Sequence, residues 1–129
     1  MSNIPEGLLY TKDDEWIRVD GEEALIGLTD YAQDALSDIV YVELPDAGEF
    51  FDTGEAFAVV ESVKAAADMY MPVAGEVLEA NEALLDEPEI LNSDPYDGGW
   101  MLRIKIDDPS ELETLMDPAA YSAYCDERA

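Results

Sequence analysis

Residues 47–57 read AGEFFDTGEAF, and residues 74–84 read AGEVLEANEAL. The second segment begins 27 residues after the first, and five of the eleven positions are identical. Gly54 corresponds to Asn81, and these two residue types most easily adopt a positive φ. We therefore expect two copies of one strand-turn-strand unit, related by a two-fold arrangement.

Lys64 lies close to the midpoint of the connection between the two copies. A two-fold arrangement would place this connection at one end of the molecule, so that Lys64 stands on an exposed turn. Lysine is scarce in this chain, and three alanines that follow Lys64 leave room around it. Because an ε-amine can be acylated, such a lysine can anchor a carboxylic cofactor through a stable amide. An isolated surface lysine is ordinarily a solvated charge, but the repeat and the scarcity of lysine favour modification here.

The composition predicts one folded domain over residues 1–129, because 48% of the residues are hydrophobic. The charge balance is strongly acidic, with 6 basic and 32 acidic residues and a net charge of −26. Nucleic acid and anionic membranes would repel this chain, so we expect neither as a partner. The spread of acids along the chain favours adaptation to a cytosol of very high salt, where screening reaches over about 3 Å at 1 M. A basic partner protein is the alternative explanation.

Cys125 is the single cysteine, which excludes an internal disulfide and suits a reducing compartment. The longest apolar run, residues 56–60, is too short to span a membrane, and the first ten residues do not resemble a signal peptide. We therefore expect a cytoplasmic location.

Short segments rich in β-branched and aromatic residues predict strands at 15–19, 24–28, 39–44, 56–62, 68–71 and 100–106. Together they indicate a mainly β fold, a compact sandwich or flattened barrel. Asp30 is expected to cap a short helix over residues 31–36, and Leu91 to Gly99 is expected to form an irregular turn.

Two helix starts are predicted near the C-terminus, at Asp108-Pro109 and at Asp117-Pro118. Cys125 shares a helix face with Tyr121 and Tyr124, and we assign it to packing rather than to redox exchange.

The residue types that most catalytic sites need are scarce. The chain has no histidine, which excludes Ser-His and Cys-His nucleophile pairs and histidine metal sites. Carboxylates are so abundant that any pair could be proposed as an acid and a base, and no calcium or phosphate-binding loop has the required spacing. The residues therefore offer little material for conventional catalysis.

The segment Glu61-Ser62-Val63-Lys64-Ala65, followed by MPVAGEV at 71–77, resembles the lipoyl-lysine hairpin of the glycine cleavage system H protein family. Further resemblance to this family covers residues 10–16, 27–33, 40–45 and 92–100 and the helix start at Asp108-Pro109. The chain departs from the family at Asp14, where histidine often precedes Glu-Trp, and in its acidity, which is consistent with a halophilic version.

The resemblance implies a barrel-sandwich hybrid of the lipoyl/biotinyl-like type. Its lipoyl hairpin core would cover about 39–106, with N-terminal strands over 8–28 and a C-terminal helical segment over 108–128. Lipoate would be attached to Lys64 by an amide bond, within a recognition context formed by Glu61, Ser62, Val63 and Ala65. Glu15 and Asp68 match the family's cleft carboxylates and are candidates for holding a protonated amine.

The resemblance also implies a monomeric carrier without turnover of its own. It would take the aminomethyl group of glycine from a PLP-dependent glycine decarboxylase to a tetrahydrofolate-dependent aminomethyltransferase. Electrons would pass to the FAD enzyme dihydrolipoamide dehydrogenase. A lipoate ligase or lipoyl transferase would load the lysine.

Four alternatives remain open from the sequence. A lipoyl-relay carrier could act outside glycine cleavage. A biotin carrier domain would share the hairpin but typically has methionine on both sides of the lysine, where this chain has Val63 and Ala65. A lipoyl domain of a 2-oxoacid dehydrogenase would belong to a longer acyltransferase chain, and an acidic decoy would act only through its charge.

Overall fold

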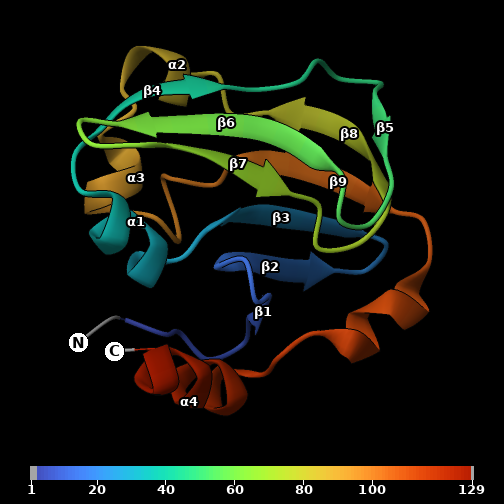
Figure 1. The fold of residues 1–129 in the computed structure, drawn as a ribbon. Coiled ribbons are helices and arrows are strands. Elements are labelled where there is room, and N and C mark those ends of the chain that lie inside the picture. Colours follow the sequence, from blue (N-terminus) through green and yellow to red (C-terminus); the bar gives the residue numbers. More distant parts are fainter. Residues whose placement is uncertain (1–2, 129) are drawn as a thin grey trace.

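Two antiparallel sheets form the body of the molecule (Figure 1). The computed structural model describes residues 3–128. The strands are β1 Leu9–Tyr10, β2 Glu15–Asp20, β3 Glu23–Leu28, β4 Ile39–Glu43, β5 Phe50–Phe51, β6 Ala56–Ser62, β7 Ala66–Tyr70, β8 Gly75–Ala80 and β9 Leu102–Ile106. The six-stranded sheet has the order β1-β2-β3-β9-β8-β5 and the three-stranded sheet the order β4-β6-β7. The expected mainly β, sandwich-like fold is confirmed.

Short helices connect and flank the strands (Figure 1). They are α1 Asp30–Leu36, α2 Ala83–Asp86, α3 Ile90–Ser93, the 3-10 helix η1 Pro109–Thr114, and α4 Pro118–Arg128. α4 lies beside β1 at the N-terminal edge of the larger sheet.

One hydrophobic core is shared by both sheets. Ile26 and Ile104 contribute to it from the larger sheet, and Val42, Val60 and Met69 from the smaller one, each at most 4% exposed. Burial of side chains of this size stabilises a fold by about 1.5–3 kcal/mol each. The core therefore fixes which face of β6 and β7 points to solvent.

The two repeat copies pair with each other, but their second halves differ. β5 of the first copy pairs with β8 of the second, with Phe50 opposite Glu76. The first copy then continues as β6, whereas the second continues as α2, so the strand-turn-strand prediction is wrong for the second copy. The difference follows from composition, because Ala83, Leu84 and Leu85 favour a helix while the phenylalanine and valines of β6 favour a strand.

Asn81 is a further correction to the repeat. Gly54 has a positive φ of 80°, but Asn81 is not among the described residues with positive φ. Its side-chain amide instead donates to the backbone carbonyls of Gly98 and Trp100, at 2.9 Å and 2.8 Å. Asn81 therefore ties the end of β8 to the loop before β9.

The helix α1 is capped by Thr29 rather than by Asp30. Thr29 has extended backbone angles, and its hydroxyl accepts a hydrogen bond from the amide of Ala32 at 3.2 Å. Asp30 is already the first helical residue, and its carboxylate accepts from the side chain of Gln33. The predicted cap was wrong by one position because two adjacent residues can both cap, and the backbone of the turn selects between them.

Both C-terminal helices begin where the sequence predicts, but the first of them is a 3-10 helix. Asp108 accepts from the amide of Ser110 at 3.0 Å but begins the 3-10 helix η1, and Asp117 accepts from the amide of Ala120 at 2.7 Å as α4 begins. Cys125 is 6% exposed and packs in a cluster with Tyr121 and Tyr124, as predicted.

Other boundaries shift as well, and β7 begins at Ala66 rather than at the expected Asp68. Part of the expected irregular turn at 91–99 is helical, because α3 ends only at Ser93. The strand expected from Trp100 begins at Leu102, and Trp100 belongs to the preceding loop.

Candidate functional site

Lys64 lies at the tip of the β6–β7 hairpin. The turn is closed by the amide of Ser62, which donates to the carbonyl of Ala65 at 2.7 Å. The Ser62 hydroxyl accepts from the amides of Lys64 and Ala65, at 3.2 Å and 3.1 Å. Because the serine satisfies these turn amides, the backbone is held while the lysine side chain remains free.

The surroundings of Lys64 suit an amide-linked arm. Val63, Lys64, Ala65 and Ala66 are all exposed, and Glu61 and Ser62 are half-buried. None of the ion pairs formed within residues 3–128 involves Lys64. Figure 1 shows the β6–β7 turn at one end of the molecule. An acyl group on this amine would therefore meet no protein atom that has to be displaced.

Glu15 is placed differently from an ordinary surface acid. It opens β2 and is 1% exposed. One carboxyl oxygen accepts from the amide of Tyr70 at 2.6 Å, and the other accepts from the hydroxyl of Thr11 at 3.1 Å. Tyr70 ends β7, an edge strand of the smaller sheet, so Glu15 links the two sheets at that edge.

Burial raises the pKa of Glu15 to about 8, although the hydrogen bonds from Tyr70 and Thr11 act in the opposite direction. The carboxyl group is therefore mainly protonated at neutral pH. In that state it can still accept a hydrogen bond, but it carries no charge to attract an ammonium group.

Asp68 lies on the outer face of β7 and is exposed. It is opposite Val59 in the β6–β7 pair and lines an open hollow of about 310 Å³ with Glu43 and Phe51. Glu15 lines another hollow of about 210 Å³, together with Lys12 and Met71. The structure thus places both candidate carboxylates along β7 but does not bring them into one pocket.

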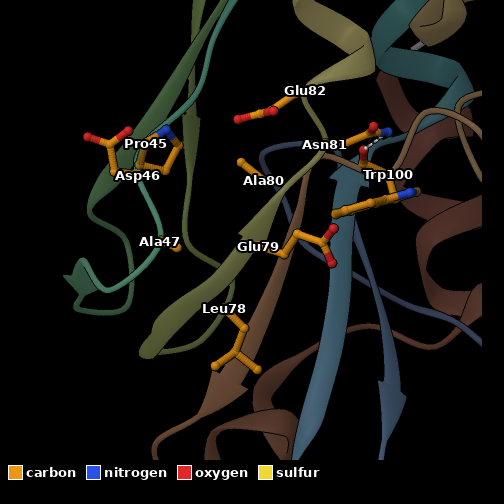
Figure 2. A pocket seen from close by; sticks show the side chains of 9 residues that line it. All are labelled: Pro45, Asp46, Ala47, Leu78, Glu79, Ala80, Asn81, Glu82 and Trp100. Carbon is orange, nitrogen blue, oxygen red and sulfur yellow. Dashed lines mark hydrogen bonds between the residues drawn. The ribbon is translucent and has the colours of Figure 1, made fainter.

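A larger hollow of about 360 Å³ lies elsewhere (Figure 2). Figure 2 shows the carboxylates of Asp46, Glu79 and Glu82 around it, with the Trp100 ring at its side. None of its lining residues belongs to the β6–β7 hairpin. It is therefore separate from the hairpin that carries Lys64.

Sequence reasoning missed two exposed residues near the hairpin, Val40 and Tyr41, which are 55% and 47% exposed. The sequence did contain a signal for this exposure. Residues 39–42 are four consecutive apolar residues, and a strand of an antiparallel sheet can bury only one of its two faces against the core. Alternation predicts that half of such a run points to solvent.

No group of three or more potential metal-ligating side chains was found within residues 3–128. No helix of this part of the chain is both long and apolar enough to cross a membrane.

Comparison with known proteins gives one consistent result. The family model described as "Glycine cleavage H-protein" matches residues 8–128. A "Glycine cleavage system H protein" of Halothermothrix orenii is 57% identical over 125 residues, covering 97% of this chain and 98% of the relative. A protein of the same name from an Anaeromyxobacter species is 50% identical with the same coverage.

A solved structure is similar over the same extent. The crystal structure of a glycine cleavage system H protein from Mycobacterium marinum superimposes with a TM-score of 0.84 at 34% identity. The match covers 97% of this chain and 98% of that chain, so the resemblance includes both sheets and α4.

Proposed function

This chain belongs to the glycine cleavage H-protein family, and from that membership we propose that Lys64 is the residue that carries its lipoate. The protein is the lipoyl carrier of the glycine cleavage system, a non-catalytic subunit. It works with glycine decarboxylase, aminomethyltransferase and dihydrolipoamide dehydrogenase, and a ligase or transferase loads it with lipoate.

The observation that supports the assignment most is the exposed position of Lys64 on a hairpin tip whose amides Ser62 already satisfies. When bound, lipoate supplies a dithiolane that accepts the aminomethyl group and two electrons. The chain's own contribution is to hold the attachment point in one place while small residues on the β7 side leave the arm room to turn. Tethering then raises the effective concentration of the arm at each docked enzyme.

Replacement of each lysine tests this assignment. Lys64→Arg should abolish lipoylation, as read by peptide mass spectrometry, with no change in the fold. Lys12→Arg and Lys105→Arg are matched controls and should be lipoylated at the parent rate. Lipoylation of Lys64→Arg at another lysine would overturn the assignment.

We also propose that Asp68 and Glu15 hold the amine of the loaded arm, as the family resemblance implies, Asp68 through its charge and Glu15 only by accepting a hydrogen bond. Asp68 is exposed beside an open hollow, whereas Glu15 is buried and mainly uncharged at neutral pH. Asp68→Asn should therefore shorten the lifetime of the loaded carrier more than Glu15→Gln does. An unchanged lifetime for Asp68→Asn would exclude Asp68 from this role.

We propose further that residues 1–129 form one carrier domain with its hairpin core at about 39–106, and that it acts as a cytoplasmic monomer. Residues 1, 2 and 129 lie outside the described residues. The net charge of −26 supports the monomer at low ionic strength, where two copies would repel each other. Sedimentation in molar salt, where this repulsion is screened, should still give the monomer mass, and a dimer would contradict the proposal.

The acidic composition is proposed to be an adaptation to high salt. At 0.01 M the screening length is about 30 Å, so like charges repel across much of a small protein, whereas at 1 M it is about 3 Å. The melting temperature should therefore rise steeply with KCl. A melting curve unchanged from dilute buffer to molar KCl would refute the halophilic interpretation.

A further inference from the structure

The exposed large hydrophobic side chains of the described residues are not evenly spread. They are Val19, Val40, Tyr41, Phe50, Val63 and Leu85. Three of the six, Val40, Tyr41 and Val63, lie on the two segments beside Lys64, and Val63 is the most exposed of all at 66%. Single exposed hydrophobic residues are common, but a group beside one reactive side chain indicates contact with a partner.

Backbone pairing brings these segments together. The amide of Val63 donates to the carbonyl of Asp38 at 3.0 Å, and Ile39 pairs with Ser62. The register of the β4–β6 pair shifts between Ile39 and Tyr41, which leaves Val40 without a partner across the pair. Such a bulge changes the direction of side chains, and here both Val40 and Tyr41 are exposed. We call Val40, Tyr41 and Val63 the tip patch.

The tip patch has an acidic surround. Tyr41 is directly opposite Glu61 in the β4–β6 pair, Glu43 follows on the same strand, and Asp38 precedes β4. The negative charge of Glu43 is the main cause that raises the pKa of Tyr41. Partial desolvation of the phenol and the charge of Glu61 act in the same direction. Lys64 is the only basic residue of the hairpin. A second copy of this chain would bring like charges together, so the partner that fits has an apolar contact surface with basic residues around it.

We propose that the tip patch is the docking surface for the enzyme that acylates Lys64, an inference that rests on the proposed lipoylation of this lysine. In that reaction the neutral ε-amine attacks the carboxyl carbon of an activated lipoyl donor. A new C–N bond forms, the bond to the activating group breaks, and the amine loses one proton.

The reach of the reacting atoms selects this partner over the enzymes of glycine cleavage. Before acylation only the lysine side chain separates the reacting nitrogen from the hairpin backbone, so the active site must approach the hairpin tip closely. The other enzymes act on sulfur atoms at the far end of the completed arm. Side chains beside Lys64 are therefore best placed to contact the acylating enzyme.

The test uses the apoprotein and a lipoate ligase of the same organism, supplied with lipoate and ATP. Val40→Ser, Tyr41→Ser and Val63→Ser are compared with Val19→Ser and Phe50→Ser, which replace exposed residues on β2 and β5. Intact mass gives initial rates of acylation, and titration calorimetry gives the Kd of the apoprotein for the ligase.

Each tip-patch substitution should lower kcat/KM about tenfold, mainly through KM, and weaken the Kd in parallel, whereas the two control variants should behave as the parent. Val63→Lys, at a position that cannot disturb the core, should lose more than Val63→Ser because it adds a charge that a basic partner repels. Once acylated, the same variants should lose less in the reverse reaction of dihydrolipoamide dehydrogenase, in which added NADH supplies the two electrons that reduce the lipoyl disulfide, than they lost in acylation.

Two results would overturn the inference. Tip-patch variants acylated at the rate of the controls would show that the patch is not contacted, and equal losses in both reactions would show that the partner is not specific to acylation. Failure of the parent protein to be acylated on Lys64 would instead refute the proposed function, so the two failures are distinguishable.

Discussion

Replacement of Glu15 by glutamine should remove one source of the pH dependence of folding. The folded state keeps the Glu15 proton up to a pH of about 8, whereas the unfolded chain releases it near 4.5. As the pH rises between these values the unfolded state is increasingly favoured, so the stability is complete below 4.5 and is lost as the pH passes through about 8. At about 1.4 kcal/mol per pH unit, the loss between pH 5.5 and 9 is about 3 kcal/mol.

Glutamine has the same shape but does not ionise. Its carbonyl can accept from the amide of Tyr70, while its amino group replaces an acceptor that now faces the hydroxyl of Thr11. We expect a fixed cost of about 1 kcal/mol for this mismatch. At pH 5.5, one unit above 4.5, the parent has already lost about 1.4 kcal/mol, which offsets this cost. The variant should therefore be about as stable as the parent at pH 5.5 and about 3–4 kcal/mol more stable at pH 9.

Urea unfolding at several pH values between 5 and 9 measures this difference directly. Molar KCl in every sample keeps the repulsion among the other acids screened. Two parallel stability profiles, separated by a constant offset, would refute the reasoning, because they would mean that Glu15 ionises equally in the folded and unfolded states.

Gly75→Ala should destabilise the fold by about 1–3 kcal/mol in urea unfolding, since the new Cβ would lie 2.6 Å from the carbonyl oxygen of Lys105 on the paired strand. Unchanged stability would mean that β8 and β9 can move apart without cost. Arg128→Ala should loosen α4, because Arg128 donates to the carboxylate of Asp14 at 2.6 Å and 3.0 Å. Hydrogen exchange of the α4 amides should become faster while that of β6 does not change; equal rates in variant and parent would count against this contact. Cys125→Ser should retain full reoxidation of the lipoyl group by dihydrolipoamide dehydrogenase, since the thiol is buried among tyrosines. A folded variant that loses reoxidation would contradict the packing role.

The position of Lys64 on an exposed turn could be predicted, because the lysine lies near the midpoint of the segment that joins the two repeat copies, and this spacing can be read from the sequence. Gly54 determines a turn, and the apolar run at residues 56–60 determines the strand β6, through local preferences. The second copy could not be predicted in the same way. Its first half follows the repeat into β8, but Leu84 is then buried from a helix, not from a strand.

Other features depend on contacts between distant segments. The pairing of Asp14 with Arg128 spans 114 residues, and it is visible only once α4 lies against β1. Arg128 also stacks between the rings of Tyr31 and Tyr124, at 4.2 Å and 4.0 Å from their centroids. The sequence showed that Asp14 departs from the family pattern. It did not show that Arg128 would pair with the aspartate at this position.

Glu15 illustrates the same limit at the site. Among 32 acidic residues it has no local feature that distinguishes it, and its burial results from the approach of β7 to the start of β2. A buried carboxyl with a raised pKa therefore could not be separated from surface acids by composition or spacing.

Peptide mass spectrometry of the protein purified from its own lipoate-replete cells tests the assignment of Lys64 most directly. We expect one lipoyl group in amide linkage on Lys64, with Lys12 and Lys105 unmodified. Lipoylation at either of these other lysines, or a Lys64 peptide that carries no lipoyl group under these conditions, would contradict it.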